Sequence, residues 1–232
     1  MNDFDMKQEL LRQGLSEDVS EQFVKYYNLL IEWNERLNLT AITAPEDVLQ
    51  KHFLDSLIAE PHIKQGARCV DIGSGAGFPG IPLKLIRPDI KLTMIDSLNK
   101  RILFLREVIS ALGLRDCYAE HLRAEEAGAD EKYRETFDAA LTRAVAPTGA
   151  IIEWSAPLLK VGGNAILYKG AHDTVQAEIN EAKGAISALH TELEPKPIET
   201  AWGERTLIIC KKLKKTDKRF PRKPGEARRK PL

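Results

Sequence analysis

The chain has 232 residues, and its 34 lysines and arginines balance 34 aspartates and glutamates. This length suits one α/β domain with an added subdomain, whose core needs no disulfide or metal for stability. The three cysteines, Cys69, Cys117 and Cys210, form no C-x-x-C pair, which argues against a zinc site or a disulfide framework. The first residues lack the apolar core of a secretion signal, and no apolar run could span a bilayer. We therefore expect a cytoplasmic protein with no membrane partner and no metal.

Residues 1–63 are predicted to form an N-terminal helical cap. Ser16 is a suitable N-cap, and a helix after it is indicated by apolar residues with helical spacing at Phe23, Leu30, Trp33 and Leu37. A second, shorter helix is predicted to begin at Pro45, because proline is tolerated in the first turn of a helix.

A glycine-rich loop follows the first predicted strand. The sequence from Cys69 to Gly80 is CVDIGSGAGFPG, in which a short apolar run breaks into closely spaced glycines before apolar residues resume. This order indicates a strand, a tight loop and a helix. The loop lets the backbone approach a ligand closely, and the helix that follows directs free N–H groups at it. The segment therefore predicts a cofactor site.

Two cofactor classes fit this loop. The glycines Gly75, Gly77 and Gly80 match the dinucleotide pattern G-x-G-x-x-G, which is typical of nicotinamide oxidoreductases. The acid Asp71 and the glycines Gly73, Gly75 and Gly77 instead form a pattern that resembles the first motif of S-adenosylmethionine-dependent methyltransferases. A carboxylate at this position disfavours a pyrophosphate and suits the ammonium group of a methionine moiety. The helical region before the loop also favours a methyltransferase.

The segment 64–212 is expected to be an α/β domain with a doubly wound, mostly parallel sheet, because predicted strands and helices alternate with short connections. Strands are predicted at 69–72, 91–95, 117–121, 137–142, 164–168 and 206–211, and helices at 81–86, 100–112, 148–159 and 172–189. Ligands of such sheets bind beyond the carboxyl ends of the strands. We therefore expect a site built from residues 73–78 and from the ends of the following strands.

Three predicted strand ends carry candidate cofactor ligands. Asp96 is placed to accept hydrogen bonds from ribose hydroxyls, and the turn with Ala124 and Glu125 to lie beside an adenine. Arg143 could hold a methionine carboxylate or the target nucleotide, or pair with a local acid such as Glu153.

His52, Asp55 and Ser56 include the residue types of a hydrolase triad. They lie on one short predicted helix, and no G-x-S-x-G nucleophile elbow surrounds Ser56, so we reject that interpretation. We expect His52 and Asp55 to cap the cofactor pocket instead.

The C-terminal segment 213–232 is predicted to be an extended basic tail. Residues 211–232 carry eleven lysines and arginines against two acids, a net charge of +9, which leaves −9 on the rest of the neutral chain. Prolines disfavour a helix there, and Phe220 could stack on a base. This charge predicts RNA phosphate contacts in the tail, and Lys169 at the end of a predicted strand could make another. The predicted RNA-binding residues are Lys169, Arg219, Arg222, Lys223, Arg228, Arg229 and Lys230.

Several segments together resemble one family, the ribosomal RNA small subunit methyltransferase G family, also called glucose-inhibited division protein B. They are WNERLNLTAI, HFLDSL, DIGSGAGFPGIPLKL, IDSLNKRILFL, RAEE, TRAVAP, LYKG and PRKPG, in this order along nearly the whole chain. The resemblance implies methylation of N7 of one guanosine in the decoding-region loop of bacterial 16S rRNA, with S-adenosylmethionine as cofactor. It implies cofactor contacts at Gly73, Phe78, Ala124, Glu125 and Arg143.

The implied chemistry requires no catalytic base and no metal, because guanine N7 is a lone-pair acceptor without a proton to remove. We therefore expect catalysis by orientation, with Arg143 as the one candidate for a catalytic role. The expected partner is 16S rRNA in the small ribosomal subunit or its assembly intermediate, bound by a monomer. The alternatives are a methyltransferase acting on another RNA, a protein or a small molecule, a nicotinamide-dependent oxidoreductase, and a non-enzymatic RNA-binding module.

Overall fold

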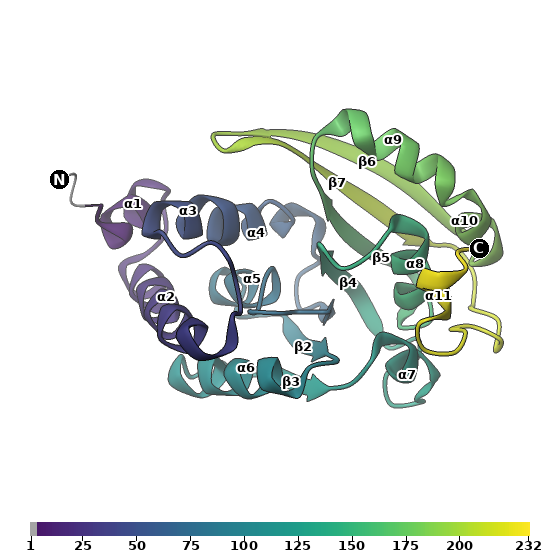
Figure 1. The fold of residues 1–232 in the computed structure, drawn as a ribbon, viewed down its shortest axis with the longest axis horizontal. Coiled ribbons are helices and arrows are strands. Elements are labelled where there is room, and N and C mark those ends of the chain that lie inside the picture. The colour runs from purple at the N-terminus through teal and green to yellow at the C-terminus, as the bar shows by residue number, and fades with distance from the viewer. Residues whose placement is uncertain (1–3) are drawn as a thin grey trace.

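The structure is a computed structural model that describes residues 4–232. Its centre is a seven-stranded sheet with the strand order β3-β2-β1-β4-β5-β7-β6 (Figure 1). All pairings are parallel except those of β7 with β5 and with β6. The predicted doubly wound, mostly parallel sheet is thus confirmed. The strands are β1 (Arg68–Ile72), β2 (Lys91–Asp96), β3 (Cys117–His121), β4 (Phe137–Arg143), β5 (Leu159–Lys169), β6 (Thr191–Thr200) and β7 (Gly203–Lys212).

Helices cover both faces of the sheet, because alternate residues of each central strand are apolar on opposite faces. Cys69 and Leu141 join one buried cluster, whereas their neighbours Val70 and Ala140 join the other. The first cluster packs against α1 (Met6–Arg12), α2 (Glu17–Leu37), α3 (Pro45–Val48), η1 (Leu49–Leu54), α5 (Gly80–Ile86) and α6 (Asn99–Ala111). The second packs against α7 (Ala124–Ala129), α8 (Thr148–Ser155), α9 (His172–Glu181), α10 (Lys183–Ala188) and α11 (Glu226–Arg229).

The N-terminal region is helical, as predicted. The Ser16 side chain accepts a hydrogen bond from the Val19 N–H and starts α2, which ends at Asn38 in a left-handed conformation. Pro45 opens a continuous run of α3, η1 and α4 (Asp55–Leu57), and η2 (Glu60–His62) leads into β1. This run places His52 and Asp55 next to the carboxyl edge of the sheet. No helix within residues 4–232 is long and apolar enough to cross a membrane.

The sequence prediction missed strand β6. Its sequence, TELEPKPIET, alternates charged residues with two prolines, a composition that argues against a strand. Both prolines are tolerated because β6 lies at the edge of the sheet, where β7 is its one partner among the described strands. The single helix predicted at 148–159 ends at Ser155, and the one predicted at 172–189 is divided into α9 and α10. Strands β6 and β7 form a hairpin that extends toward α4 (Figure 1).

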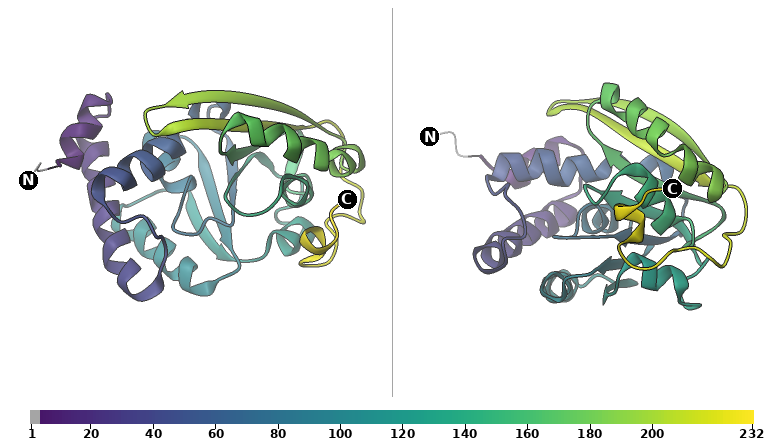
Figure 2. Two further views of the ribbon diagram at one scale, coloured as in Figure 1. Left: turned by 45° about the horizontal axis from the view of Figure 1, so that its top comes forward. Right: turned by 45° about the vertical axis from the view of Figure 1, so that its right-hand side comes forward.

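The expectation of an extended basic tail is wrong. Phe220 is 3% exposed and Ala227 2%, and both belong to the second hydrophobic cluster. The Arg134 guanidinium donates hydrogen bonds to the carbonyl groups of Thr216, Asp217 and Phe220. Figure 2 shows the yellow C-terminal segment lying against the body of the protein. The prolines do exclude a long helix, but apolar burial docks the segment nonetheless.

We expect Phe220→Ala to lower the free energy of unfolding by about 3–4 kcal/mol, because it removes a fully packed aromatic ring. Urea denaturation measures the change. Leu213→Ala is the matched control, since Leu213 precedes Phe220 in the same segment and is 44% exposed. A Phe220 variant as stable as the Leu213 variant would contradict docking of the C-terminal segment.

Candidate active site

Two adjoining cavities lie at the carboxyl edge of the sheet. The first, about 290 Å³, lies between the ends of β1 and β2, the start of α7, and α8; we call it the adenosine cavity, after the ligand part that the sequence predicts there. The second, about 350 Å³, lies between the glycine loop, η1 and the end of β4; we call it the transfer cavity, after the group transfer that the sequence predicts. The two share part of their lining, namely Gly73, Arg101, Val145 and Arg228. They therefore form one continuous groove across the strand ends.

The glycine loop forms the floor of this groove. Gly75 has a φ of +59°, and a Cβ built on it would meet only the Gly73 carbonyl oxygen, at 3.9 Å. Because Gly75 lines the transfer cavity, an added side chain would take up space that a ligand needs. Gly77 serves packing instead, since a Cβ there would lie 2.7 Å from the Tyr26 hydroxyl. The predicted close approach of backbone and ligand is thus possible at Gly75.

Asp96 lies under the loop and also lines the adenosine cavity. Its carboxylate is 3% exposed and accepts hydrogen bonds from the N–H groups of Gly75, at 3.0 Å, and Leu98, at 2.9 Å. The Arg101 guanidinium adds a contact of 3.2 Å. These donors hold the carboxylate at the cavity wall, the position expected of a ribose acceptor.

Asp71 lines neither cavity of the groove. It is fully buried below the loop, where one carboxylate oxygen accepts a hydrogen bond from the Gly80 N–H at 2.9 Å. The other oxygen has no hydrogen-bond partner among residues 4–232. Burial raises the pKa of Asp71 to about 7. The structure therefore places this carboxylate against the start of α5, and not beside a ligand ammonium as expected.

The turn at Ala124 and Glu125 forms the far wall of the adenosine cavity. Both residues belong to the first turn of α7, and within residues 4–232 their backbone N–H groups have no protein acceptor. Such free donors suit the acceptor nitrogens of a purine. The Glu125 carboxylate is 7% exposed and accepts a hydrogen bond from the Gly225 N–H at 2.9 Å.

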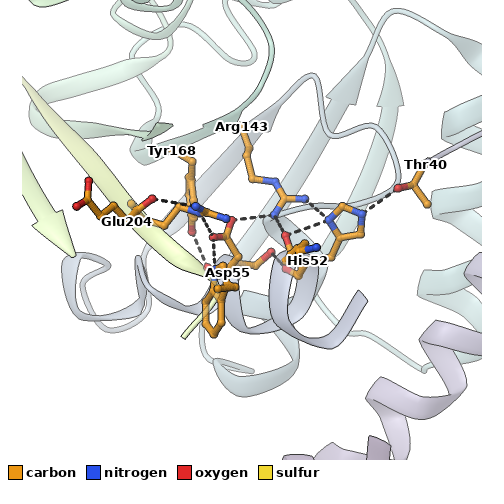
Figure 3. A network of polar contacts seen from close by, with 10 residues as sticks. Thr40, His52, Asp55, Arg143, Tyr168 and Glu204 are labelled. Atoms are coloured by element: carbon orange, nitrogen blue, oxygen red, sulfur yellow. Dashed lines mark hydrogen bonds and ion pairs between the residues drawn. The ribbon is translucent and has the colours of Figure 1, made fainter. Parts of the chain in front are cut away.

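Arg143, at the end of β4, lies in the transfer cavity at the centre of a polar network (Figure 3). Its guanidinium donates to an Asp55 carboxylate oxygen and to the Lys51 carbonyl, both at 3.2 Å, and to His52 Nδ1 at 2.9 Å. It also lies 5.1 Å from the centre of the Phe78 ring. Glu153, the acid that the sequence offered as an alternative partner for Arg143, pairs with Arg222 instead. The partner of Arg143 therefore comes from the N-terminal helices.

These contacts determine the protonation state of His52. Nδ1 lies near both the Arg143 guanidinium, at 2.9 Å, and the Lys51 carbonyl, at 3.1 Å. Arginine can only donate, so the shorter contact assigns Nδ1 as an acceptor, and Nε2, which lies 2.9 Å from the Thr40 hydroxyl oxygen, then carries the hydrogen. Burial, with the positive charge of Arg143 next, lowers the pKa of His52 to about 4. The imidazole stacks on Phe78 with ring centres 4.5 Å apart. The transfer cavity thus contains a neutral histidine.

Asp55 connects this network to the β6–β7 hairpin. Its carboxylate accepts a hydrogen bond from Trp202 Nε1 at 3.0 Å and forms an ion pair with Arg205 Nε at 2.6 Å. The sequence indicated that His52 and Asp55 cap the site, and the structure places both beside Arg143. No sequence pattern pointed to Thr40, Trp202 or Arg205, because these residues reach the network only through tertiary folding.

The residues predicted to bind RNA differ in their surroundings. Lys169 pairs with Glu178 at 2.5 Å, and Arg222 pairs with the buried Glu153, so a phosphate would have to compete with these carboxylates. The remaining predicted residues are exposed: Arg219, Lys223, Arg228, Arg229 and Lys230. Within residues 4–232, no group of three metal-ligating side chains comes together.

The fold, with its glycine loop and a groove across the strand ends, is that of solved S-adenosylmethionine-dependent methyltransferases. A solved structure of such an enzyme from Aquifex aeolicus has the same fold, with a TM-score of 0.53 and 16% identity over 71% of this chain and 92% of that one.

Sequence comparison defines the family. The family model for rRNA small subunit methyltransferase G matches residues 19–202. Ribosomal RNA small subunit methyltransferase G from Alkaliphilus metalliredigens is 45% identical over 217 residues, which are 91% of this chain and 90% of the relative. Its counterpart from Lachnoclostridium phytofermentans is 48% identical over 227 residues, 96% of this chain and 93% of the relative. The chain belongs to the rRNA small subunit methyltransferase G family.

We expect His52 to remain neutral to near pH 5, with a protonation midpoint at about pH 4. Because its folded pKa is depressed, its contribution to stability is present above pH 6.5 and is lost as the pH falls toward 4. NMR of the ¹⁵N-labelled imidazoles measures the midpoint, and His52→Gln identifies the signal. A midpoint near 6.5 would contradict the neutral, Nε2-protonated state.

Proposed function

We propose that this protein transfers a methyl group from S-adenosylmethionine to N7 of a guanosine in the decoding-region loop of 16S rRNA. The observation that carries the proposal is the continuous groove across the strand ends, in a chain of this family. Its first part suits an adenosine and its second part a methionine with an acceptor base beside it. The proposed substrate is the small ribosomal subunit or its assembly intermediate, bound by a monomer in the cytoplasm.

The chain's own residues fit the cofactor. Asp96 would accept the ribose hydroxyls, and the free N–H groups at Ala124 and Glu125 would face the adenine edge. Gly73 and Gly75 would pass under the methionine part without a Cβ in the way. Arg143 is the one guanidinium at the end of β4 and would hold the methionine carboxylate.

The cofactor supplies an electrophilic methyl group, so the protein mainly has to orient the acceptor. Guanine N7 has no proton to lose, so the proposed reaction assigns no side chain the role of a general base. Phe78 and the neutral His52 give the transfer cavity a flat aromatic wall without positive charge. Asp55 offsets the charge of Arg143. Arg101, which also lines this cavity, pairs with Asp96. Two of the three arginines in the cavity lining are thus paired with carboxylates, which lowers their opposition to the positive charge that develops on the methylated purine.

RNA phosphates would meet the exposed basic residues of the C-terminal segment, among them Lys223, Arg229 and Lys230. Four of the seven sequence-predicted cations, Arg219, Lys223, Arg229 and Lys230, remain available for this role. Lys169 and Arg222 are themselves at most 17% exposed and form ion pairs with carboxylates, and Arg228 contacts the Val145 carbonyl and the Trp154 ring. Contacts of this kind give affinity that falls with rising salt concentration.

We expect transfer of labelled methyl groups to small ribosomal subunits isolated without their native modification, giving N7-methylguanosine in 16S rRNA. Mass spectrometry of the nucleosides identifies the product. Naked 16S rRNA and tRNA are assayed alongside, which separates the subunit from free RNA as substrate. Incorporation into tRNA alone, or a product other than N7-methylguanosine, would contradict the proposal.

We expect Gly75→Ala to weaken cofactor binding at least tenfold, because the methyl group would project into the transfer cavity. Calorimetry with S-adenosylmethionine measures the dissociation constant. Gly113→Ala is a close control: its φ of +62° matches the +59° of Gly75, and nothing lies within 4 Å of its added Cβ. Both variants should lose about 1 kcal/mol of stability from backbone strain. Equal affinities in the two variants would place the ligand elsewhere.

A further inference from the structure

We propose that the C-terminal segment Phe220–Lys230, which we call the C-terminal clasp, forms one wall of the adenosine cavity and retains the cofactor there. The inference rests on the proposed use of this cavity for S-adenosylmethionine. Gly225 and Arg228 line the adenosine cavity, and Arg228 also lines the transfer cavity. Every other lining residue of the adenosine cavity lies between Ile72 and Trp154. The clasp therefore completes a cavity that the sheet edge leaves open.

The base of the clasp is fixed by a buried ion pair. Glu153, on α8, is 1% exposed, and its carboxylate accepts hydrogen bonds from the Arg222 backbone N–H, from Nε and, at 2.6 Å, from Nη2. A buried carboxylate without this partner would be strongly destabilising, so the pair keeps the base docked. Packing is also close at the preceding residue, because a Cβ added to Gly128 of α7 would lie 3.0 Å from the Pro221 side chain.

The tip of the clasp touches the residues that we assign to the cofactor. The Gly225 N–H donates to the Glu125 carboxylate at 2.9 Å, so clasp and adenine wall share one hydrogen bond. The Arg228 guanidinium donates to the Val145 carbonyl and lies 5.1 Å from the centre of the Trp154 ring. Val145 and Trp154 both line the adenosine cavity.

The base and the tip differ in how firmly they are held. Arg222 is 17% exposed in its side chain, whereas Arg228 is exposed and is held by one carbonyl and one aromatic face. Opening of the tip would therefore uncover one small core residue, Ala227, but would leave Phe220 and the Arg222–Glu153 pair in place. A ligand that contacts the closed wall binds the docked clasp better than the open one, so occupancy and docking stabilise each other.

We expect Arg228→Ala to raise the dissociation constant for S-adenosylmethionine about fivefold in calorimetry, about the effect of losing one hydrogen bond. Glu153→Gln, which loosens the base but lines neither cavity of the groove, should also weaken binding. Lys218→Ala is the charge-matched control, since it removes one exposed positive charge from the same end of the chain. Its dissociation constant should equal that of the wild type.

Limited trypsin digestion supplies a second readout. Cleavage after Arg228 and Arg229 should slow when S-adenosylhomocysteine is added, in proportion to its occupancy. Equal affinities for Arg228→Ala and Lys218→Ala, without this protection, would overturn the clasp while leaving the proposed function intact. A wild-type protein that binds no S-adenosylmethionine would overturn both.

Discussion

A single buried carboxylate, Asp55, joins three parts of the chain at the edge of the sheet where the ligand groove lies. Its two oxygens balance Arg143 from β4 and Arg205 from β7, and Trp202 adds a neutral hydrogen bond. Two guanidiniums this close to each other would repel without the carboxylate between them. The two ion pairs of Asp55 therefore hold the N-terminal helices, the central sheet and the β6–β7 hairpin in one arrangement. That arrangement also positions Arg143 in the transfer cavity.

Burial and charge balance also explain which chemistry the site suits. The buried surroundings of His52 keep its imidazole neutral, and the ion pair with Asp55 offsets the charge of Arg143. An aromatic wall and a compensated arginine can orient a flat base without moving a proton. Orientation of this kind accounts for a large part of a barrier when the acceptor is already a lone pair, about 7–11 kcal/mol in favourable systems.

The C-terminal segment shows why net charge is a poor guide to conformation. Its excess of lysines and arginines predicts solvation and contact with phosphates, yet Phe220 and Ala227 are buried and Arg222 is paired with Glu153. Charge composition reports on long-range attraction, whereas docking depends on a few apolar side chains and one matching buried acid. The segment can serve both purposes, because its inner side faces the groove and Lys223, Arg229 and Lys230 face solvent.

The sequence by itself determined the parallel sheet, the helical N-terminal region, the glycine loop and the strand ends that carry Asp96 and Arg143. These follow from local periodicity, turn chemistry and the rule that ligands bind at the carboxyl ends of parallel strands. Tertiary structure alone decided that Asp71 lies below the loop, that β6 pairs at the sheet edge despite its prolines, and that Arg143 meets Asp55. It also decided that Gly225 and Arg228 close the adenosine cavity. Such contacts join residues far apart in the chain, and their partners are selected by burial and charge balance, which no local pattern records.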